Sequence, residues 1–341
     1  MFTRISATLL ILAIDFSAVM HTIGHARVAH AASEPTVRKI TVEPGVQLEV
    51  LDWGGPANDP HARSLVFLSG LGDTAHVYDD FARRFTAKVH VYGITRRGFG
   101  ASSKPDPGDA NYSADRLGQD VIAVIDALHL DHPVLAGHSI AGEELSWIGS
   151  HDPQKVAGLI YLDADWGPGF YDKARGDAWL DMLAVRHRLE ALRAGAVYDA
   201  AYHDSLMTAA DQLSHDLHAD AAFYAALAPV PAPPAPAPIP LAVLFGEDKF
   251  TGIHGPAMDI VACPHDLSPM FRGPLASDKA AQQALAAHDL EECTSQSAAF
   301  GQAMPWVPVV RIAHASHYIF QSNPEEVERA MNDFLAKTPT S

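Results

Sequence analysis

One stretch of the sequence decides the fold: Val134-Leu135-Ala136-Gly137-His138-Ser139-Ile140-Ala141-Gly142. Its first residues are apolar and suit a short buried strand, and its last residues open a helix. A strand-to-helix turn this tight holds Ser139 in a strained backbone conformation and exposes its hydroxyl above the sheet. Small residues are needed on either side, and they are supplied by Gly137 and by Ala141, with Gly142 next. The stretch therefore predicts a nucleophilic serine at a strand end.

Short apolar runs alternate with helical patterns around this stretch, which favours an α/β fold with a mostly parallel sheet covered by helices on both faces. Two amphipathic helices are expected, one over residues 113–129 with Ser113 as its N-cap and one over residues 324–335. The expected strands cover residues 38–42, 47–53, 65–68, 89–94, 134–136, 159–162 and 309–312.

The stretch 166–256 does not continue the strand–helix rhythm, because it is rich in alanine, histidine and aromatic residues and ends in a proline-rich segment, 229–240. We interpret it as a helical cap with a stiff, extended connector, inserted into a core made of residues 34–165 and 257–341. An ordinary set of core helices is the alternative.

The N-terminal residues 1–33 have the layout of a secretory signal peptide. Arg4 is followed by an apolar run, and Ala29-His30-Ala31 fits the usual cleavage pattern. We therefore expect a secreted or periplasmic protein, or otherwise a cytoplasmic one with an unstructured tail, and no membrane span. In an exported protein the two cysteines, Cys263 and Cys293, could form one disulfide, but two buried thiols fit the sequence equally well.

The charge balance argues against nucleic acid as a partner. The chain has 24 Lys+Arg against 41 Asp+Glu, a formal net charge of -17, and no basic run. The 19 histidines are scattered, so we expect no metal site and no cofactor.

Four segments together resemble the α/β-hydrolase superfamily, in particular its branch of serine esterases related to soluble epoxide hydrolases and haloalkane dehalogenases. They are the turn at Ser139 and residues 65–72, 95–102 and 313–318, which look like the family's oxyanion loop, R-G-x-G-x-S loop and catalytic-histidine loop. The resemblance implies a mostly parallel, eight-stranded sheet. Because epoxide hydrolases and dehalogenases of this fold use aspartate where Ser139 stands, it also implies acyl transfer through serine.

A serine hydroxyl needs a base, and the expected base is His317, just after the last strand, with His314 as its rival. The expected oxyanion-hole donors are the backbone N–H groups of Leu71 and Ile140. The predicted substrate contacts are Gly70, His138, Trp166 and Phe170.

The third member of the triad has three candidates. Asp163 ends the sixth strand and is favoured, because some superfamily members carry their acid there. Asp266 and then Asp248 are the alternatives, since each follows a segment that could be the seventh strand, at 258–263 or 241–245. The sequence leaves this choice open.

The predicted function is hydrolysis of a carboxylic ester of a small, largely apolar molecule through an acyl-enzyme on Ser139. A C–C hydrolase, lactonase, thioesterase or cofactor-free perhydrolase would use the same triad. A non-catalytic ligand-binding homologue is the alternative from another class, although such proteins usually lose the nucleophile or the base. A peptidase would need Glu143 or Glu144 to point inward, whereas we interpret both as dipole or surface residues.

Overall fold

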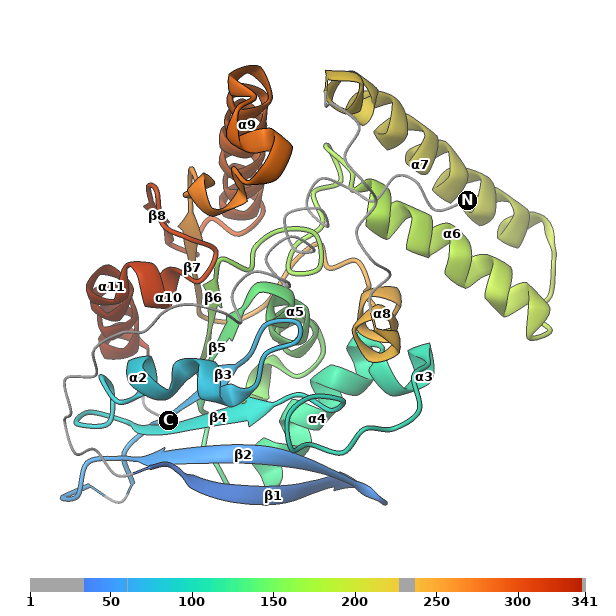
Figure 1. Cartoon of the computed structure of the whole chain (residues 1–341). Coiled ribbons are helices and arrows are strands. Elements are labelled where there is room, and N and C mark those ends of the chain that lie inside the picture. The colour runs from blue at the N-terminus through green and yellow to red at the C-terminus, as the bar shows by residue number, and fades with distance from the viewer. Residues whose placement is uncertain (1–33, 60, 227–236, 339–341) are drawn as a thin grey trace.

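The computed structural model describes residues 34–59, 61–226 and 237–338, and within these ranges the strands form an eight-stranded sheet in the order β1-β2-β4-β3-β5-β6-β7-β8 (Figure 1). β2 is antiparallel to both of its neighbours, and every other neighbouring pair is parallel. The strands are β1 (Thr36–Glu43), β2 (Val46–Gly54), β3 (Ser64–Leu68), β4 (His90–Thr95), β5 (Val134–His138), β6 (Gly158–Leu162), β7 (Ala257–Ala262) and β8 (Val309–Ile312).

Helices cover both faces of the sheet, as the alternating pattern predicted. The α-helices are α2 (Asp79–Ala82), α3 (Asp109–Tyr112), α4 (Ala114–Ala127), α5 (Gly142–His151), α6 (Ala178–Arg193), α7 (Ala200–Ala226), α8 (Pro238–Phe245), α9 (Lys279–Ala303), α10 (Ile319–Ser322) and α11 (Pro324–Lys337). The side chain of Ser113 accepts a hydrogen bond from the backbone N–H of Arg116, which confirms it as the N-cap of α4.

Two apolar layers hold these helices against the sheet. Side chains that alternate along each strand point to opposite faces, so Val66 and Leu68 pack with α4 and α5 while Leu65 and Phe67 pack with α2 and α11. The parallel strands β3, β5, β6 and β7 are buried along their whole length, as expected for a sheet covered on both faces.

The seventh strand is Ala257–Ala262, which is the predicted segment 258–263 shifted by one residue toward the N-terminus. The other segment, 241–245, is wrong as a strand, because it lies in α8. Pro238 begins that helix, where a missing N–H costs nothing, whereas a proline-bounded segment is a poor central strand. The predicted extended connector, 229–240, is also wrong at its end, because residues 238–240 belong to α8. Residues 229–236 of this segment lie outside the described ranges.

Three α-helices, α6, α7 and α8, lie between β6 and β7 in the sequence, and their role as a cap stays a prediction. Helices α6 and α7 pack against each other well away from the sheet, and α8 packs against α3 (Figure 1). The long helix α9 lies between β7 and β8 in the sequence and contacts α7. The predicted signal peptide, residues 1–33, lies outside the described part of the chain, in which no helix is both long and apolar enough to cross a bilayer.

The two cysteines form a disulfide that joins the end of β7 to α9. The sequence had left this pairing open. The covalent link fixes the segment that follows β7 to one face of α9, and this segment lies at the edge of the sheet where the candidate site is found.

A buried ion pair anchors the loop after β4. The Nε and Nη2 atoms of Arg97 donate to the two carboxylate oxygens of Asp120, both at 2.6 Å, and the two side chains are 0% and 5% exposed. Burial raises the pKa of Asp120, and Arg97 opposes that rise. The pair therefore keeps two charges satisfied in the interior.

We predict that Asp120→Ala lowers the free energy of unfolding by about 3 kcal/mol, because it leaves the buried Arg97 guanidinium with only the partly exposed carboxylate of Glu43 as a partner. Urea denaturation measures the loss. The matched control is Asp126→Ala, which breaks an exposed pair with Lys155 and should cost less than about 1 kcal/mol. Equal losses in the two variants would contradict the prediction.

Candidate active site

Five loops meet at the edge of the sheet where the parallel strands end. Because β3, β5, β6, β7 and β8 all run in the same direction, the residues that follow them gather on one side. These residues are Ser69 to Leu71 after β3, Ser139 after β5, Asp163 after β6, His265 after β7 and His317 after β8.

Ser139 lies at the predicted turn between β5 and α5. Its φ of 57° is in the left-handed region, which is uncommon for a residue with a side chain and is found at functional turns. A Cβ added to Gly142 would lie 2.1 Å from the carbonyl oxygen of Ala164. The glycine that this turn needs is therefore Gly142, and Ala141 is tolerated one position earlier. Ser139 is 3% exposed, so its hydroxyl does not face open solvent.

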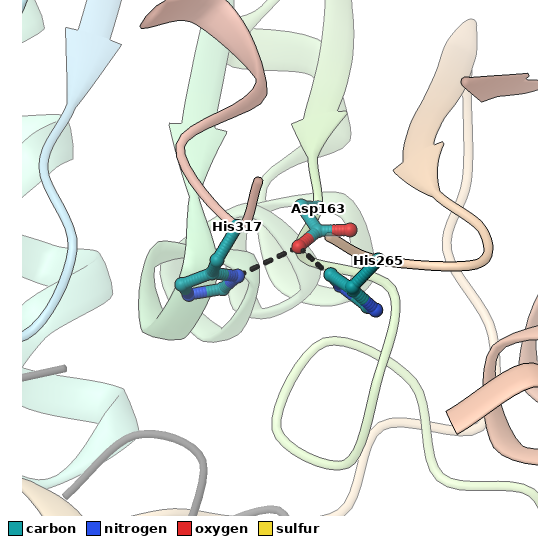
Figure 2. Close-up of side chains that lie close together, drawn as sticks. All are labelled: Asp163, His265 and His317. Carbon is teal, nitrogen blue, oxygen red and sulfur yellow. Dashed lines mark hydrogen bonds and ion pairs between the residues drawn. The ribbon is translucent and has the colours of Figure 1, made fainter. Parts of the chain in front are cut away.

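His317 connects Ser139 to Asp163. The hydroxyl of Ser139 lies 2.9 Å from Nε2 of His317. Nδ1 of the same ring lies 2.6 Å from Oδ2 of Asp163, as Figure 2 shows. With Nδ1–H donating to the carboxylate, Nε2 is free to accept the proton of the serine hydroxyl. The rival His314 is exposed, and its backbone N–H donates to the carbonyl of Pro264.

Of the three candidate acids, the structure brings Asp163 to His317. Asp163 is 3% exposed, and its Oδ1 accepts the backbone N–H of Ala262 at 2.8 Å. Burial alone would raise its pKa, but His265 and His317 outweigh burial and hold the pKa well below its usual range. Asp266 and Asp248 are both exposed, and each accepts a local backbone N–H instead.

His265 also contacts Asp163 and was not singled out from the sequence. Its Nε2 lies 2.9 Å from the same Oδ2 that His317 contacts. Asp163, His265 and His317 thus offer three potential metal ligands close together. Nε2 of His265 and Nδ1 of His317, however, both point at Oδ2 of Asp163 at hydrogen-bond distances. A zinc ion would instead require the three ligand atoms to point at one shared position about 2.0–2.2 Å from each of them. The arrangement is that of a hydrogen-bonded chain.

A second buried ion pair supports the loop after β3. Arg96 donates to Glu144 at 2.6 Å and to the carbonyls of Ser69 and Gly70 at 3.0 and 3.2 Å. The expectation that Glu144 is a surface residue is therefore wrong, because it is 3% exposed and its carboxylate pairs with the arginine that supports this loop. It does lie in the first turn of α5, where a carboxylate suits the helix dipole. Glu143 is also fully buried, and its carboxylate accepts the backbone N–H of Asp248.

The predicted oxyanion donors, Leu71 and Ile140, lie in the loop after β3 and in the turn at Ser139. Arg96 and Glu144 connect these two segments. Leu71 packs against the apolar cluster that contains Ile140. Their role as donors stays a prediction.

His138 lies behind the triad rather than in an open pocket. It is 1% exposed, and its Nε2–H donates to the carbonyl of His317 at 2.9 Å. Burial and the neighbouring His317 lower its pKa to about 3, so the ring is neutral. A Cβ on Gly70 would lie 2.9 Å from His138 Nδ1, so glycine leaves room for this ring. His138 thus contacts the loop that carries His317, and a contact of Gly70 or His138 with substrate stays a prediction.

A cavity of about 160 Å³ lies on the acid side of the triad. Trp166 and Phe170 line it together with His317, Asp163 and His265, whereas Ser139 is absent from the described residues that line it. Its remaining lining includes several carboxylates, among them Asp165, whose pKa burial and the charge of Asp163 raise to about 7. The lining is thus more acidic than the predicted apolar pocket.

Comparisons with known proteins agree with this geometry. The model of the alpha/beta hydrolase family matches residues 65–330. The 3-oxoadipate enol-lactonase 2 of Acinetobacter baylyi is 33% identical over 106 residues, which are 31% of this chain and 38% of the relative. The pyrethroid hydrolase of Sphingobium wenxiniae is 37% identical over 70 residues, 17% of this chain and 22% of the relative. The chain thus matches about two fifths or less of these relatives' lengths.

Two solved structures share the fold over most of the chain. A hydrolase from Pseudomonas aeruginosa has a TM-score of 0.55 at 18% identity and covers 88% of this chain and 98% of its own. The proline iminopeptidase-related protein of Thermus thermophilus has a TM-score of 0.54 at 16% identity and covers 90% and 99%. With the family model matching most of the chain and the sheet order and strand-end residues in place, the chain belongs to the alpha/beta hydrolase family.

Proposed function

We propose that this protein is a serine hydrolase that cleaves a carboxylic ester, or a closely related acyl bond, through an acyl-enzyme on Ser139. The observation that carries the proposal is the continuous hydrogen-bonded chain from the Ser139 hydroxyl through His317 to Asp163. In this mechanism His317 takes the serine proton during attack and gives it to the leaving group. Asp163 orients the ring and balances its positive charge. The N–H groups of Leu71 and Ile140 stabilise the oxyanion.

The substrate is a small molecule with an apolar portion. Trp166 and Phe170 support this part of the proposal because they line the cavity beside His317. The carboxylates in the same lining disfavour a substrate that carries its own carboxylate near that end, since like charges in a partly buried site repel. A lactone remains a candidate for the same chemistry, given the similarity to an enol-lactonase. The intact triad supports an enzyme over a non-catalytic binding protein.

We expect a fluorophosphonate probe to label the wild-type protein and not Ser139→Ala, because the probe reacts with an activated serine. Intact-protein mass measures the adduct. Ser268→Ala, which changes an exposed serine, is the control and should be labelled like the wild type. A panel of neutral esters, lactones and carboxylate-bearing esters then identifies the substrate class. Labelling that survives in Ser139→Ala would refute the proposal.

The acid is tested by a pair of substitutions. We expect Asp163→Asn to lower kcat on the order of 10⁴-fold, because the new amide would donate to Nδ1 of His317 and hold the ring in the wrong tautomer. Oδ1 already accepts the N–H of Ala262, so the Asn oxygen is best placed there and its NH₂ faces the histidine. Asp266→Asn should change kcat less than about tenfold. Comparable losses in the two variants would argue against Asp163.

We propose that the protein is exported. The signal-like N-terminal pattern and the disulfide between Cys263 and Cys293 support this, since disulfides persist in oxidising compartments. Expression of the full chain in a bacterial host should place it outside the cytoplasm, with a mass that fits cleavage near Ala31. Recovery of the uncleaved chain from the cytoplasmic fraction would contradict export.

A further inference from the structure

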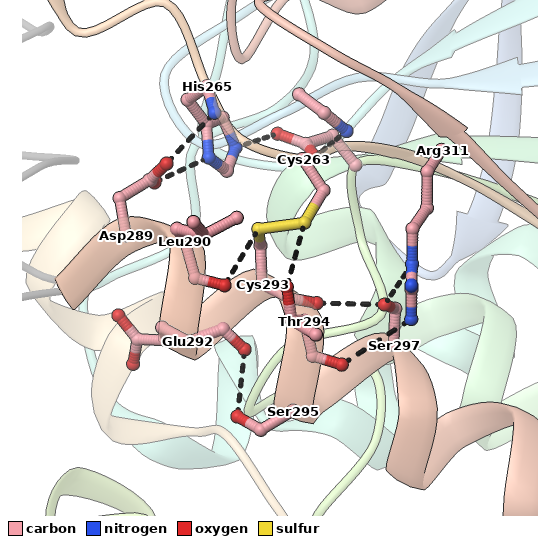
Figure 3. The surroundings of a disulfide bond; sticks show 12 residues. Cys263, His265, Asp289, Leu290, Glu292, Cys293, Thr294, Ser295, Ser297 and Arg311 are labelled. Atoms are coloured by element: carbon pink, nitrogen blue, oxygen red, sulfur yellow. Dashed lines mark hydrogen bonds and ion pairs between the residues drawn. A yellow bond between two sulfur atoms is a disulfide. The ribbon is translucent and has the colours of Figure 1, made fainter. Parts of the chain in front are cut away.

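His265 is held between two carboxylates. Its Nε2 lies 2.9 Å from Oδ2 of Asp163 (Figure 2). Its Nδ1 lies 2.7 Å from Oδ1 of Asp289 on α9 (Figure 3). The backbone N–H of His265 donates to the other oxygen of Asp289 at 2.9 Å. A neutral imidazole has one N–H and could satisfy only one of these carboxylates, so both contacts require the protonated ring.

The charge of His265 is maintained by its surroundings. Burial lowers its pKa, but Asp163 and Asp289 outweigh burial and raise the pKa well above its usual value. Besides His265, the cavity is lined by these charged and titratable groups: Asp163 and Asp165 after β6, Tyr171, Asp172, Arg175 and Asp177 before α6, Asp216 on α7, Asp289 and Glu292 on α9, and His317 after β8. Arg175 pairs with Glu292, whereas His265 and His317 lie in direct contact with Asp163. Of the two rings, His265 is the one held between two carboxylates.

The position of His265 is fixed by both backbone and covalent contacts. It forms a bridge with Ala315 in the loop that carries His317, so the two loops are paired beyond the ends of β7 and β8. Cys263, two residues before His265, is bonded to Cys293 on α9. Asp289 lies four residues before Cys293, one turn along the same face of that helix. The disulfide and the His265–Asp289 pair thus join the same two segments (Figure 3).

We propose that His265, held as an imidazolium by Asp289, is a positioning residue that keeps the Asp163 carboxylate ionised and oriented toward His317. The functional unit is then the chain of five side chains Ser139–His317–Asp163–His265–Asp289. Beyond Ser139 and its base His317, the positive ring of His265 lies between the negative carboxylates of Asp163 and Asp289. The inference rests on the proposed function, because it assigns a role within the same triad. His265 does not touch the reacting atoms and acts through Asp163.

The first test uses His265→Gln, which can still donate a hydrogen bond to Asp163 but carries no charge. We expect kcat to fall about 10- to 100-fold, as is typical when the outer partner of an active-site ligand is changed, while KM changes little. We also expect the acidic limb of the kcat/KM profile to move to higher pH. Without the imidazolium, the negative charge of Asp163 is less compensated, so the Asp163–His317 pair binds its inactivating proton more readily.

The second test uses His265→Ala and added imidazole. Removing the ring opens the space beside Asp163 to the 160 Å³ cavity that already borders it, so imidazole can enter. We expect imidazole to restore turnover in His265→Ala and to leave Asp163→Ala inactive. If His265→Ala does not fold, Asp289→Asn tests the same idea, because it keeps a hydrogen-bond acceptor for Nδ1 and removes the second carboxylate charge. The acidic limb of the kcat/KM profile of Asp289→Asn should move to higher pH, by a smaller amount than in His265→Gln.

His254→Gln, the same change at an exposed histidine, is the control and should leave the rate and the profile unchanged. A His265→Gln variant with wild-type kcat and an unmoved acidic limb would overturn the inference. So would a variant that loses only thermal stability while its profile stays in place, which is what a purely structural role predicts. Fluorophosphonate labelling separates the two proposals: an unlabelled wild type refutes the triad, whereas equal labelling rates in wild type and His265→Gln refute only the role of His265.

Discussion

The carboxylate of Asp163 is the interaction on which the site depends. It lies at the end of β6, accepts the backbone N–H of Ala262 on β7, and accepts hydrogen bonds from His317 after β8 and His265 after β7. One buried charge therefore ties together the ends of three adjacent strands. Burying a carboxylate is costly unless hydrogen bonds and opposite charge replace its water, and all of these are supplied here by neighbours in the sheet.

The two arginines after β4 show the same principle in the neighbouring loops. Arg97 is paired with Asp120 and fixes the loop itself, whereas Arg96 is paired with Glu144 and holds the carbonyls of Ser69 and Gly70. Because Glu144 lies on α5, directly after the turn at Ser139, the ion pair couples the nucleophile's helix to the predicted oxyanion loop. Rigid support of this kind is what a preorganised oxyanion site needs.

The features that the sequence predicts most directly are local ones. A strand, a strained turn and a helix are encoded within nine residues around Ser139, and His317 follows directly after the last strand. The acid was harder, because three strand ends each offered an aspartate at a plausible distance in sequence. Only the register of β6, β7 and β8 determines which of them reaches His317. The segment 241–245 fits a strand in the sequence but is helical in the structure for a related reason, since a short apolar run has no period that separates strand from helix.

The sequence by itself determined the alternation of strands and helices and the tight turn at Ser139, because these follow from local pattern and steric need; it also predicted Ser139 as nucleophile and His317 as base. The tertiary structure decided that Gly142 is the residue that must lack a side chain, since the carbonyl of Ala164 approaches it from another segment. It also decided that Cys263 and Cys293 pair, and that His265 lies between Asp163 and Asp289. These contacts join residues 22, 30, 102 and 24 positions apart in the sequence, and no local pattern encodes which distant groups the packed sheet will bring together.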